Sequence, residues 1–160
     1  MQSMHKEQVE AIVSDLSDQP GALLVILHRI QDAIGYLPEE SIPLIASGLN
    51  LSRADVHGVV SFYQHFRSTP PGRYIVQICR AESCQAMGSR ELEAYAKKTL
   101  GIDFGETTRD GQITLEPIYC LGNCACSPSV RVGQRIYSHV DATQFDELLS
   151  ELTTEPLEIV

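Results

Sequence analysis

The five cysteines are the residues of this chain whose types and spacing most clearly indicate chemistry. Two lie in CRAESC, residues 79–84, and three lie in CLGNCAC, residues 120–126. Clustered thiols in a reducing compartment indicate metal or redox chemistry more often than stable disulfides. Five is also an odd number, so a disulfide framework would leave one thiol over, whereas a four-cysteine metal site with one spare thiol accounts for all of them.

The spacing leaves three kinds of site open. Cys79 and Cys84 form a C-x4-C pair, and Cys120 and Cys124 form a C-x3-C pair. A four-residue gap occurs in plant-type ferredoxins, which carry a two-iron cluster, while zinc sites more often use closer pairs although C-x4-C falls within their range. Thiol–disulfide exchange or purely structural cysteines are the third interpretation. Spacing alone favours an iron–sulfur site, with zinc as the main alternative.

The residues around the second pair allow more than one role. Cys126 either packs near the site as a small apolar side chain or replaces Cys124 as a ligand. Gly122 lies where a bulky side chain would crowd a cluster and a positive φ is useful, but glycine is equally common in ordinary turns. Three loop residues are candidate hydrogen-bond donors to the sulfurs, although loops ordinarily contain such residues: Ser83, Asn123 and Ser127.

The remaining side chains indicate no catalytic group. The five histidines are dispersed and form no cysteine–histidine pair of the Rieske type. His28 lies in a segment that reads as a buried helix, so we expect it in the core or at an interface. No GxGxxG, P-loop or GxSxG motif occurs, so neither nucleotide binding nor acyl chemistry is indicated.

Charge and composition limit the classes of partner that this chain is expected to bind. The net charge is −9 and the twelve basic residues are scattered, which argues against nucleic acid and against an anionic membrane surface. The opening MQSMHKEQVE is polar, and no apolar run approaches the roughly twenty residues of a membrane span. We therefore expect a soluble cytoplasmic protein whose partners are proteins or small molecules, with no nucleic acid and no membrane.

Residues 1–70 are expected to form a helical bundle. Apolar periodicity and turn residues divide this part into four helices, the last of which begins with Ser52 as N-cap and Asp55 three residues later. The expected helices cover 6–16, 22–35, a segment from about Pro38, and 52–66. The stretch STPPG, residues 68–72, cannot continue a helix and is expected to link the two parts, with the boundary near residue 71.

Residues 71–160 are expected to form a small α/β unit, which makes the whole chain α+β. The expected strands cover 73–79, 112–119, 129–132 and 135–138, and the expected helices cover 89–101, capped by Ser89, and 141–152. Asp110-Gly111 and Gly133-Gln134 predict hairpin turns, and the tail from residue 153 is expected to be loose. If the first two strands are parallel neighbours, both cysteine loops emerge at one edge of the sheet, where α/β sheets place ligands.

The motifs taken together resemble a known family. CRAESC followed further along the chain by CLGNC and SPSVRVG resembles the thioredoxin-like [2Fe-2S] ferredoxin family that includes the 24-kDa subunit of respiratory complex I, and GYLPEE and ADVHGVVSFYQHF occur in that family's order. This resemblance spans about residues 7–152. It implies a helical bundle followed by a thioredoxin-like [2Fe-2S] domain, with one cluster held by Cys79, Cys84, Cys120 and Cys124. Cys126 matches no ligand of the family.

The resemblance also implies a place in a larger enzyme. Three stretches, GALLVILHRIQDAIGYLP, LNLSRADVHGVVSFYQHFR and LEPIYCLGNCACSP, look most like the gamma subunit of soluble NAD-dependent, molybdenum-containing formate dehydrogenases. Such a subunit transfers electrons next to a flavin- and NAD-binding beta subunit, with FMN, further Fe–S clusters and the molybdenum cofactor held by the beta and alpha subunits. The alternatives are the diaphorase subunit of an NAD-linked hydrogenase, the 24-kDa subunit of complex I, and a structural zinc module that mediates protein interactions.

Overall fold

A computed structural model describes residues 2–154 of this 160-residue chain. The chain divides into two units, Met1–Pro70 and Pro71–Val160. Each unit has its own cluster of buried apolar side chains. Within residues 2–154, no helix combines the length and the apolar composition needed to cross a lipid bilayer.

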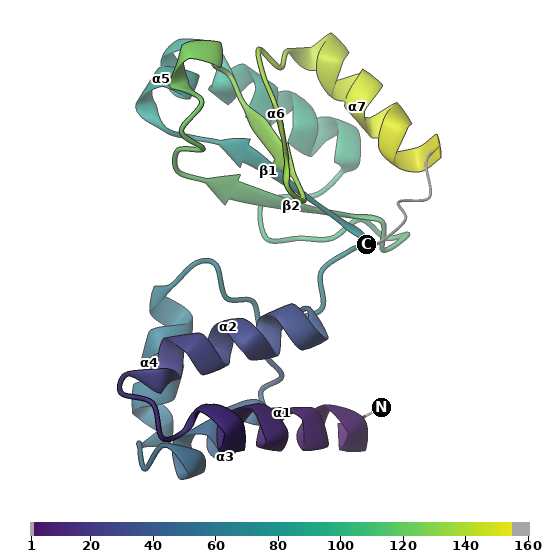
Figure 1. Ribbon diagram of the computed structural model, residues 1–160. Helices are drawn as coiled ribbons and strands as arrows, with labels where there is room; N and C mark the ends of the chain where they lie inside the picture. Colours follow the sequence, from purple (N-terminus) through teal and green to yellow (C-terminus); the bar gives the residue numbers. More distant parts are fainter. Residues whose placement is uncertain (1, 155–160) are drawn as a thin grey trace. The chain divides into compact units, whose positions relative to one another are not determined.

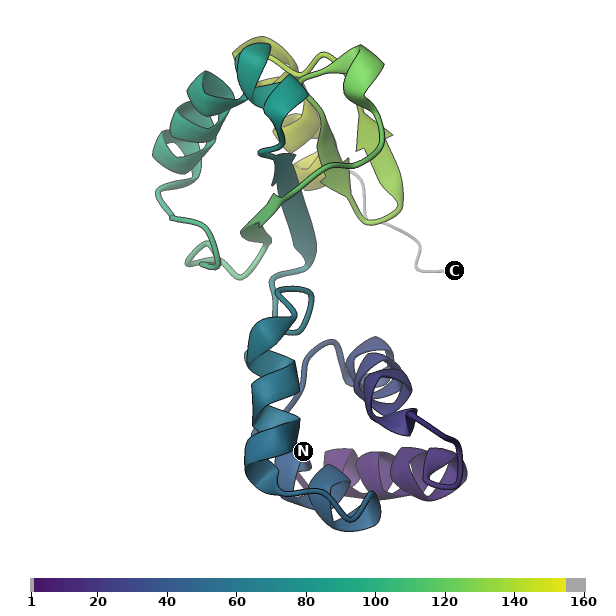
Figure 2. The same ribbon diagram turned by 90° about the vertical axis from the view of Figure 1, so that its left-hand side faces the viewer.

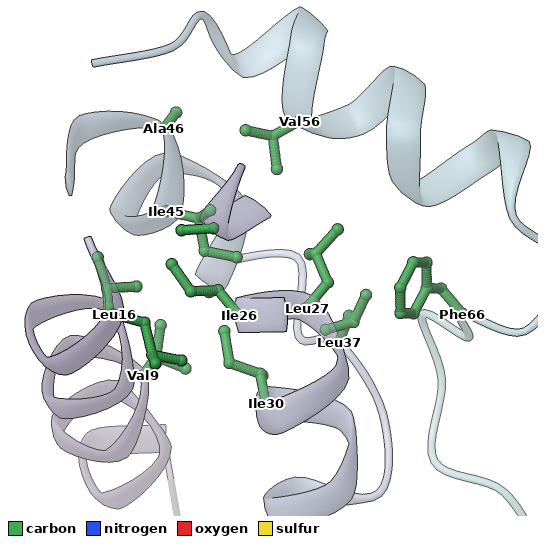
Figure 3. Close-up of a cluster of buried hydrophobic side chains, with 12 residues drawn as sticks. Val9, Leu16, Ile26, Leu27, Ile30, Leu37, Ile45, Ala46, Val56 and Phe66 are labelled. Atoms are coloured by element: carbon green, nitrogen blue, oxygen red, sulfur yellow. The ribbon is translucent and has the colours of Figure 1, made fainter. Parts of the chain in front are cut away.

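The first unit is built from four helices (Figure 1). They are α1, Gln2–Leu16; α2, Ala22–Ile34; α3, Ser41–Gly48; and α4, Arg53–Phe62. Figure 3 shows apolar side chains from all four helices pointing into one interior, with Ile26, Ile45 and Val56 completely buried. Burial of these side chains is the main force that holds the helices together. The interior that the four helices share confirms the helical bundle expected from the sequence.

Local residues account for where two helices stop or start. Gly35 follows α2 with a φ of 93°, a left-handed conformation that glycine adopts without strain. At the start of α4, the Asp55 N–H donates to Ser52 Oγ at 3.1 Å and the Ser52 N–H donates to Asp55 Oδ2 at 3.1 Å. This reciprocal pair is the capping box that the sequence predicts.

Two helix boundaries and one side chain differ from the expectation. Helix α4 ends at Phe62, earlier than Phe66, and α3 begins at Ser41, after a turn in which the Pro38 carbonyl accepts the Ser41 N–H and hydroxyl. His28 is exposed, so it does not lie in the core of this unit, and the expectation of an interface position stays a prediction. Its ring packs beside His65, with ring centroids 5.2 Å apart.

The second unit contains a four-stranded sheet in the order β2-β1-β3-β4. Its strands are β1, Tyr74–Cys79; β2, Ile113–Ile118; β3, Val130–Val132; and β4, Arg135–Tyr137. Strand β1 pairs in parallel with β2 and antiparallel with β3, and β3 pairs antiparallel with β4 across the predicted Gly133-Gln134 turn. Pro117 lies in the edge strand β2, a position that tolerates the missing N–H of proline.

Helices complete the second unit. They are α5, Glu82–Ala86; α6, Ser89–Leu100; the short 3-10 helix η1, Cys124–Cys126; and α7, Ala142–Thr154. Helices α6 and α7 lie side by side, and the Tyr95 hydroxyl of α6 donates to Asp146 Oδ2 of α7 at 2.6 Å. Helix α7 runs past the expected end at residue 152, and the remainder of the tail predicted to be loose, 155–160, lies outside the described residues. Helix α5 was not expected, because five residues are too short to show apolar periodicity.

Of two local expectations in the second unit, one is wrong and one is confirmed only in part. Ser89 does not cap α6: Gly88 occupies the cap position, and the Ser89 hydroxyl donates to the Cys79 carbonyl at 2.5 Å, tying the helix to the end of β1. Asp110-Gly111 forms a tight turn, and the segment before it pairs antiparallel with the start of β2 only briefly, at the bridge between Thr107 and Thr114, where the Thr108 N–H donates to the Ile113 carbonyl at 2.8 Å and the Leu115 N–H donates to the Glu106 carbonyl at 3.1 Å.

Candidate metal centre

The carboxyl ends of β1 and β2 bring the two cysteine loops together. The parallel register places Cys79, the last residue of β1, opposite Ile118, the last residue of β2, and Cys120 follows two residues later. Figures 1 and 2 show α5 and η1 as neighbours at this end of the sheet. The expectation that both loops emerge at one edge is therefore confirmed.

Cys79 and Cys84 form a buried pair, with 2% and 3% of their surfaces exposed. Burial raises the pKa of Cys79, but hydrogen bonds from the Ala81 N–H, the Cys84 thiol and the N–H groups of Cys120 and Leu121 outweigh it and lower the pKa overall. Burial raises the pKa of Cys84 and prevails there. A negative charge in this pair is therefore favoured on Cys79.

Cys120 and Cys124 form an exposed pair, with their Sγ atoms 3.8 Å apart. The loop reaches this arrangement through two left-handed residues, Cys120 at φ 75° and Gly122 at φ 74°. The Gly122 N–H donates to Cys120 Sγ at 3.4 Å. A Cβ on Gly122 would meet no other atom within 4 Å, so the backbone conformation, not crowding by the protein, is what calls for glycine here.

The two pairs lie within electrostatic reach of each other. The thiol hydrogen bond and the charge of Cys120 raise the pKa of Cys124, and the charges of Cys84 and Cys79 raise it further. The N–H groups of Cys120 and Leu121 in turn face the Cys79 sulfur. Two segments far apart in the sequence thus bring two thiol pairs near each other.

Two serine hydroxyls lie between the loops. The Cys84 thiol donates to Ser127 Oγ at 3.4 Å, and Ser127 Oγ lies 2.9 Å from Ser83 Oγ. The Cys124 carbonyl accepts from both hydroxyls, at 3.0 Å from Ser83 and 2.9 Å from Ser127. Of the three expected hydrogen-bond donors, Ser127 therefore contacts a sulfur directly and Ser83 contacts Ser127.

Asn123 and Cys126 have other contacts. The Asn123 amide donates to Ser129 Oγ at 3.1 Å and to Ser138 Oγ at 2.8 Å, which braces the loop against the segment before α7. Cys126 is half-buried, and its carbonyl accepts from the His139 N–H at 2.9 Å. Its thiol is not among the groups that shift the pKa of Cys124.

The pairwise arrangement fits a two-iron cluster. Two sulfurs on one tetrahedral ion are about 3.8 Å apart when the metal–sulfur distance is about 2.3 Å, and the Cys120 and Cys124 sulfurs have this spacing. A [2Fe-2S] cluster takes four cysteines, two on each iron. Between residues 2 and 154, no group of three or more His, Cys, Asp or Glu side chains is arranged around one point for a metal ion.

Comparison with known proteins gives concordant matches. The family model described as thioredoxin-like [2Fe-2S] ferredoxin matches residues 9–153. The chain is 35% identical over 150 residues to the NADP-reducing hydrogenase subunit HndA of Solidesulfovibrio fructosivorans, covering 94% of this chain and 87% of that protein. It is 36% identical over 132 residues to an NADH-quinone oxidoreductase subunit of Aquifex aeolicus (strain VF5), covering 82% of each.

A solved structure shares the fold. The crystal structure of an NAD+-reducing [NiFe]-hydrogenase in the air-oxidised state superposes with a TM-score of 0.69 at 22% identity. The match covers 84% of this chain but only 23% of the hydrogenase chain, so this chain spans under a quarter of that polypeptide.

Proposed function

This chain belongs to the thioredoxin-like [2Fe-2S] ferredoxin family, which implies one [2Fe-2S] cluster, and we propose that it is an electron-transfer subunit of an oxidoreductase complex. The proposed ligands are Cys79, Cys84, Cys120 and Cys124. The observation that carries this proposal is the convergence of two thiol pairs at the carboxyl ends of the parallel strands β1 and β2.

The chain's own residues supply ligation, burial and hydrogen bonds. When bound, the cluster supplies a one-electron carrier. The inner pair, Cys79 and Cys84, is shielded from water, whereas Cys120 and Cys124 face solvent. We place the approach of redox partners on the exposed side.

Spectroscopy of the anaerobically purified chain tests this function. We expect visible absorption that bleaches with dithionite, and an EPR signal that appears on reduction. A colourless, EPR-silent protein that contains zinc would contradict the proposal and would support the structural zinc module instead. A reversible disulfide without iron would indicate thiol–disulfide chemistry.

We further propose that the complex is an NAD-dependent formate dehydrogenase, in which this chain is the gamma subunit. The support is the similarity of three stretches, ending with LEPIYCLGNCACSP, to that subunit. Its partners are then a flavin- and NAD-binding beta subunit with FMN and further Fe–S clusters, and a molybdenum-containing alpha subunit. The reaction is formate + NAD+ to CO2 + NADH, and this chain contributes no substrate site.

A hydrogenase or an NADH-quinone oxidoreductase is an equally supported setting. The specific observation is that relatives at 35% and 36% identity, matched over 87% and 82% of their length, carry those names. Purification of the native complex through a tag on this chain separates the candidates. Formate-dependent NAD+ reduction with molybdenum in the complex supports the first; hydrogen-dependent reduction of a nicotinamide nucleotide with nickel or iron, or quinone-dependent NADH oxidation, supports the alternatives.

A further inference from the structure

The Ser127 hydroxyl is the side-chain oxygen that touches one of the proposed ligand sulfurs. It lies 3.4 Å from Cys84 Sγ, and Ser127 has only 3% of its surface exposed. Water therefore does not compete freely for this contact. The inference developed from it rests on the proposed function, because it concerns Cys84 as a cluster ligand.

Protonation decides the direction of this hydrogen bond. In the cluster-free chain the Cys84 thiol carries one hydrogen, for which Ser127 Oγ and the Cys79 sulfur are both acceptors within reach, while the Ser127 hydroxyl donates to the Cys124 carbonyl at 2.9 Å. A metal-bound cysteine is a thiolate and has no hydrogen to give. The contact then persists as a hydrogen bond only if the Ser127 hydroxyl donates to sulfur.

A serine hydroxyl has one hydrogen, so the Ser127 hydroxyl cannot donate a full hydrogen bond to the Cys84 sulfur and to the Cys124 carbonyl at the same time. Ser83 resolves this competition. Its hydroxyl lies 3.0 Å from the same Cys124 carbonyl, so that acceptor remains satisfied when the Ser127 hydrogen turns away. Ser83 Oγ also lies 2.9 Å from Ser127 Oγ, but with both hydrogens assigned to the sulfur and the carbonyl no hydrogen lies between the two oxygens.

We propose that Ser127 donates a hydrogen bond to the Cys84 thiolate, and that Ser83 is the positioning residue that makes the Ser127 hydrogen available by occupying the Cys124 carbonyl. Reduction adds negative charge to the site, and a donor aimed at a ligand sulfur stabilises that charge. The buried setting strengthens the effect because the local dielectric is low. Together the two serines raise the reduction potential.

Redox titration of the cluster-loaded chain, followed by EPR, tests the role of Ser127. We expect Ser127→Ala to make reduction about threefold to tenfold less favourable, which corresponds to a midpoint potential about 30 to 60 mV lower at 59 mV per tenfold for one electron. Ser127→Thr keeps a hydroxyl and is expected to restore most of the shift. An unchanged midpoint in Ser127→Ala overturns the inference.

A double-mutant cycle tests the role of Ser83. Ser83→Ala alone is expected to lower the midpoint by part of the Ser127→Ala shift, because the Cys124 carbonyl then recaptures the Ser127 hydrogen. In the Ser127→Ala background, Ser83→Ala is expected to add nothing. Equal shifts in both backgrounds overturn the positioning role. If Ser127→Ala does not retain the cluster, Ser83→Ala alone still decides, since an unchanged midpoint contradicts the proposal.

The matched control is Ser129→Ala, which removes another buried hydroxyl from the same loop while retaining every backbone N–H. That hydroxyl donates to the Cys126 carbonyl at 3.3 Å and accepts from Asn123, so its loss is expected to leave the midpoint unchanged. An equal shift in Ser129→Ala would attribute the effect to loop packing and overturn the inference. Absence of a reducible cluster in the wild-type chain is a different result, which counts against the proposed function itself.

Discussion

Cys124 and Cys126 lie two residues apart on the same turn of η1, yet they meet different surroundings. The Cys124 sulfur is 3.8 Å from Cys120 Sγ and lies within electrostatic reach of the inner pair. Cys126 is held by its backbone, through the His139 N–H and the Asn123 carbonyl. The neighbouring cysteines therefore have different contacts, and we expect the Cys124 thiol, but not the Cys126 thiol, to be a cluster ligand.

Serine substitution of each thiol checks this division. Cys126→Ser is expected to retain the visible absorption and the EPR signal of the reduced chain. Cys124→Ser is expected to lose the cluster or to shift its spectra, because one of the four sulfurs is removed. Loss of the reduced EPR signal in Cys126→Ser, with retention in Cys124→Ser, would reverse the ligand assignment.

Gly122 is expected to be sensitive to substitution for a backbone reason. Its φ of 74° is left-handed, so Gly122→Ala should cost about 1–2 kcal/mol in the loop, and thermal loss of the cluster absorbance should occur at a lower temperature. Gly58 in α4 is the matched control, since its φ is not left-handed and an added Cβ meets nothing within 4 Å. Equal thermal stability of the Gly122→Ala and Gly58→Ala variants would contradict this explanation.

Cysteine spacing was the strongest signal of a functional site in the sequence, because cysteines that bind one metal site occur at a limited set of separations along the chain. The roles of individual polar side chains were weaker signals. Ser89 matched the pattern of a helix cap, but its hydroxyl bonds instead to the Cys79 carbonyl, a residue ten positions earlier. Ser127 and Asn123 appeared equivalent as loop residues, and only the folded loop shows that one contacts a sulfur and the other braces the turn.

At the scale of elements, α4 shows which parts of a helix are local and which are not. Its start is encoded within four residues by the capping box of Ser52 and Asp55. The end of α4 is set by a side chain of α2. The Gln31 side-chain Nε2 donates to the His65 carbonyl at 2.9 Å, and the Gln31 side-chain Oε1 accepts from the Arg67 N–H at 2.9 Å. These tertiary bonds hold the chain out of the helix, and no pattern near Phe66 could have predicted them.

Removal of the cap should destabilise the first unit. We expect Ser52→Ala to lower the free energy of unfolding by about 1 kcal/mol, measured by urea denaturation followed by circular dichroism. Ser61→Ala is the matched control, because Ser61 is exposed in the same helix and its hydroxyl donates to the Gly58 carbonyl, not to a group at the start of the helix. A control variant that loses as much stability as Ser52→Ala would exclude capping as the cause.

The same cap makes a pH prediction. The Ser52 hydroxyl and N–H hold the pKa of Asp55 below its ordinary value in the folded chain. The stabilisation is therefore complete above the unfolded pKa of about 3.9 and is lost as the pH falls through the lowered folded pKa. The difference in unfolding free energy between wild type and Ser52→Ala should shrink as the pH falls below 4. A difference that stays constant in acid would be inconsistent with an ionised Asp55 in the cap.

At the scale of the whole molecule, the unlike composition of the two parts of the sequence predicts two domains, and the folded chain has two separate cores. The first 70 residues contain no cysteine, and their core is formed by side chains of four helices together with the loop residues Leu37 and Phe66. The core of the second unit lies between the sheet and its helices, with Ile78, Leu115 and Phe145 completely buried. All four proposed ligands belong to the second unit.

A fragment of residues 71–160 is therefore expected to fold and to hold the cluster by itself. The measurement is visible absorption and EPR of the fragment compared with the full chain, with urea unfolding followed in parallel. We expect the same spectra, because the contacts described for the four cysteines come from this unit alone. A fragment that is unfolded or lacks the cluster would show that the helical unit is required for the site.

The unequal burial of the two thiol pairs has a kinetic consequence. In the cluster-free chain, an alkylating reagent should modify Cys120 and Cys124 in a fast phase, whereas Cys79 and Cys84 should react only as quickly as the fold opens locally. Mass spectrometry of timed iodoacetamide labelling distinguishes two phases from one. Chemical modification of the site, and the reversal of that modification, should then begin at the two solvent-facing residues, Cys120 and Cys124.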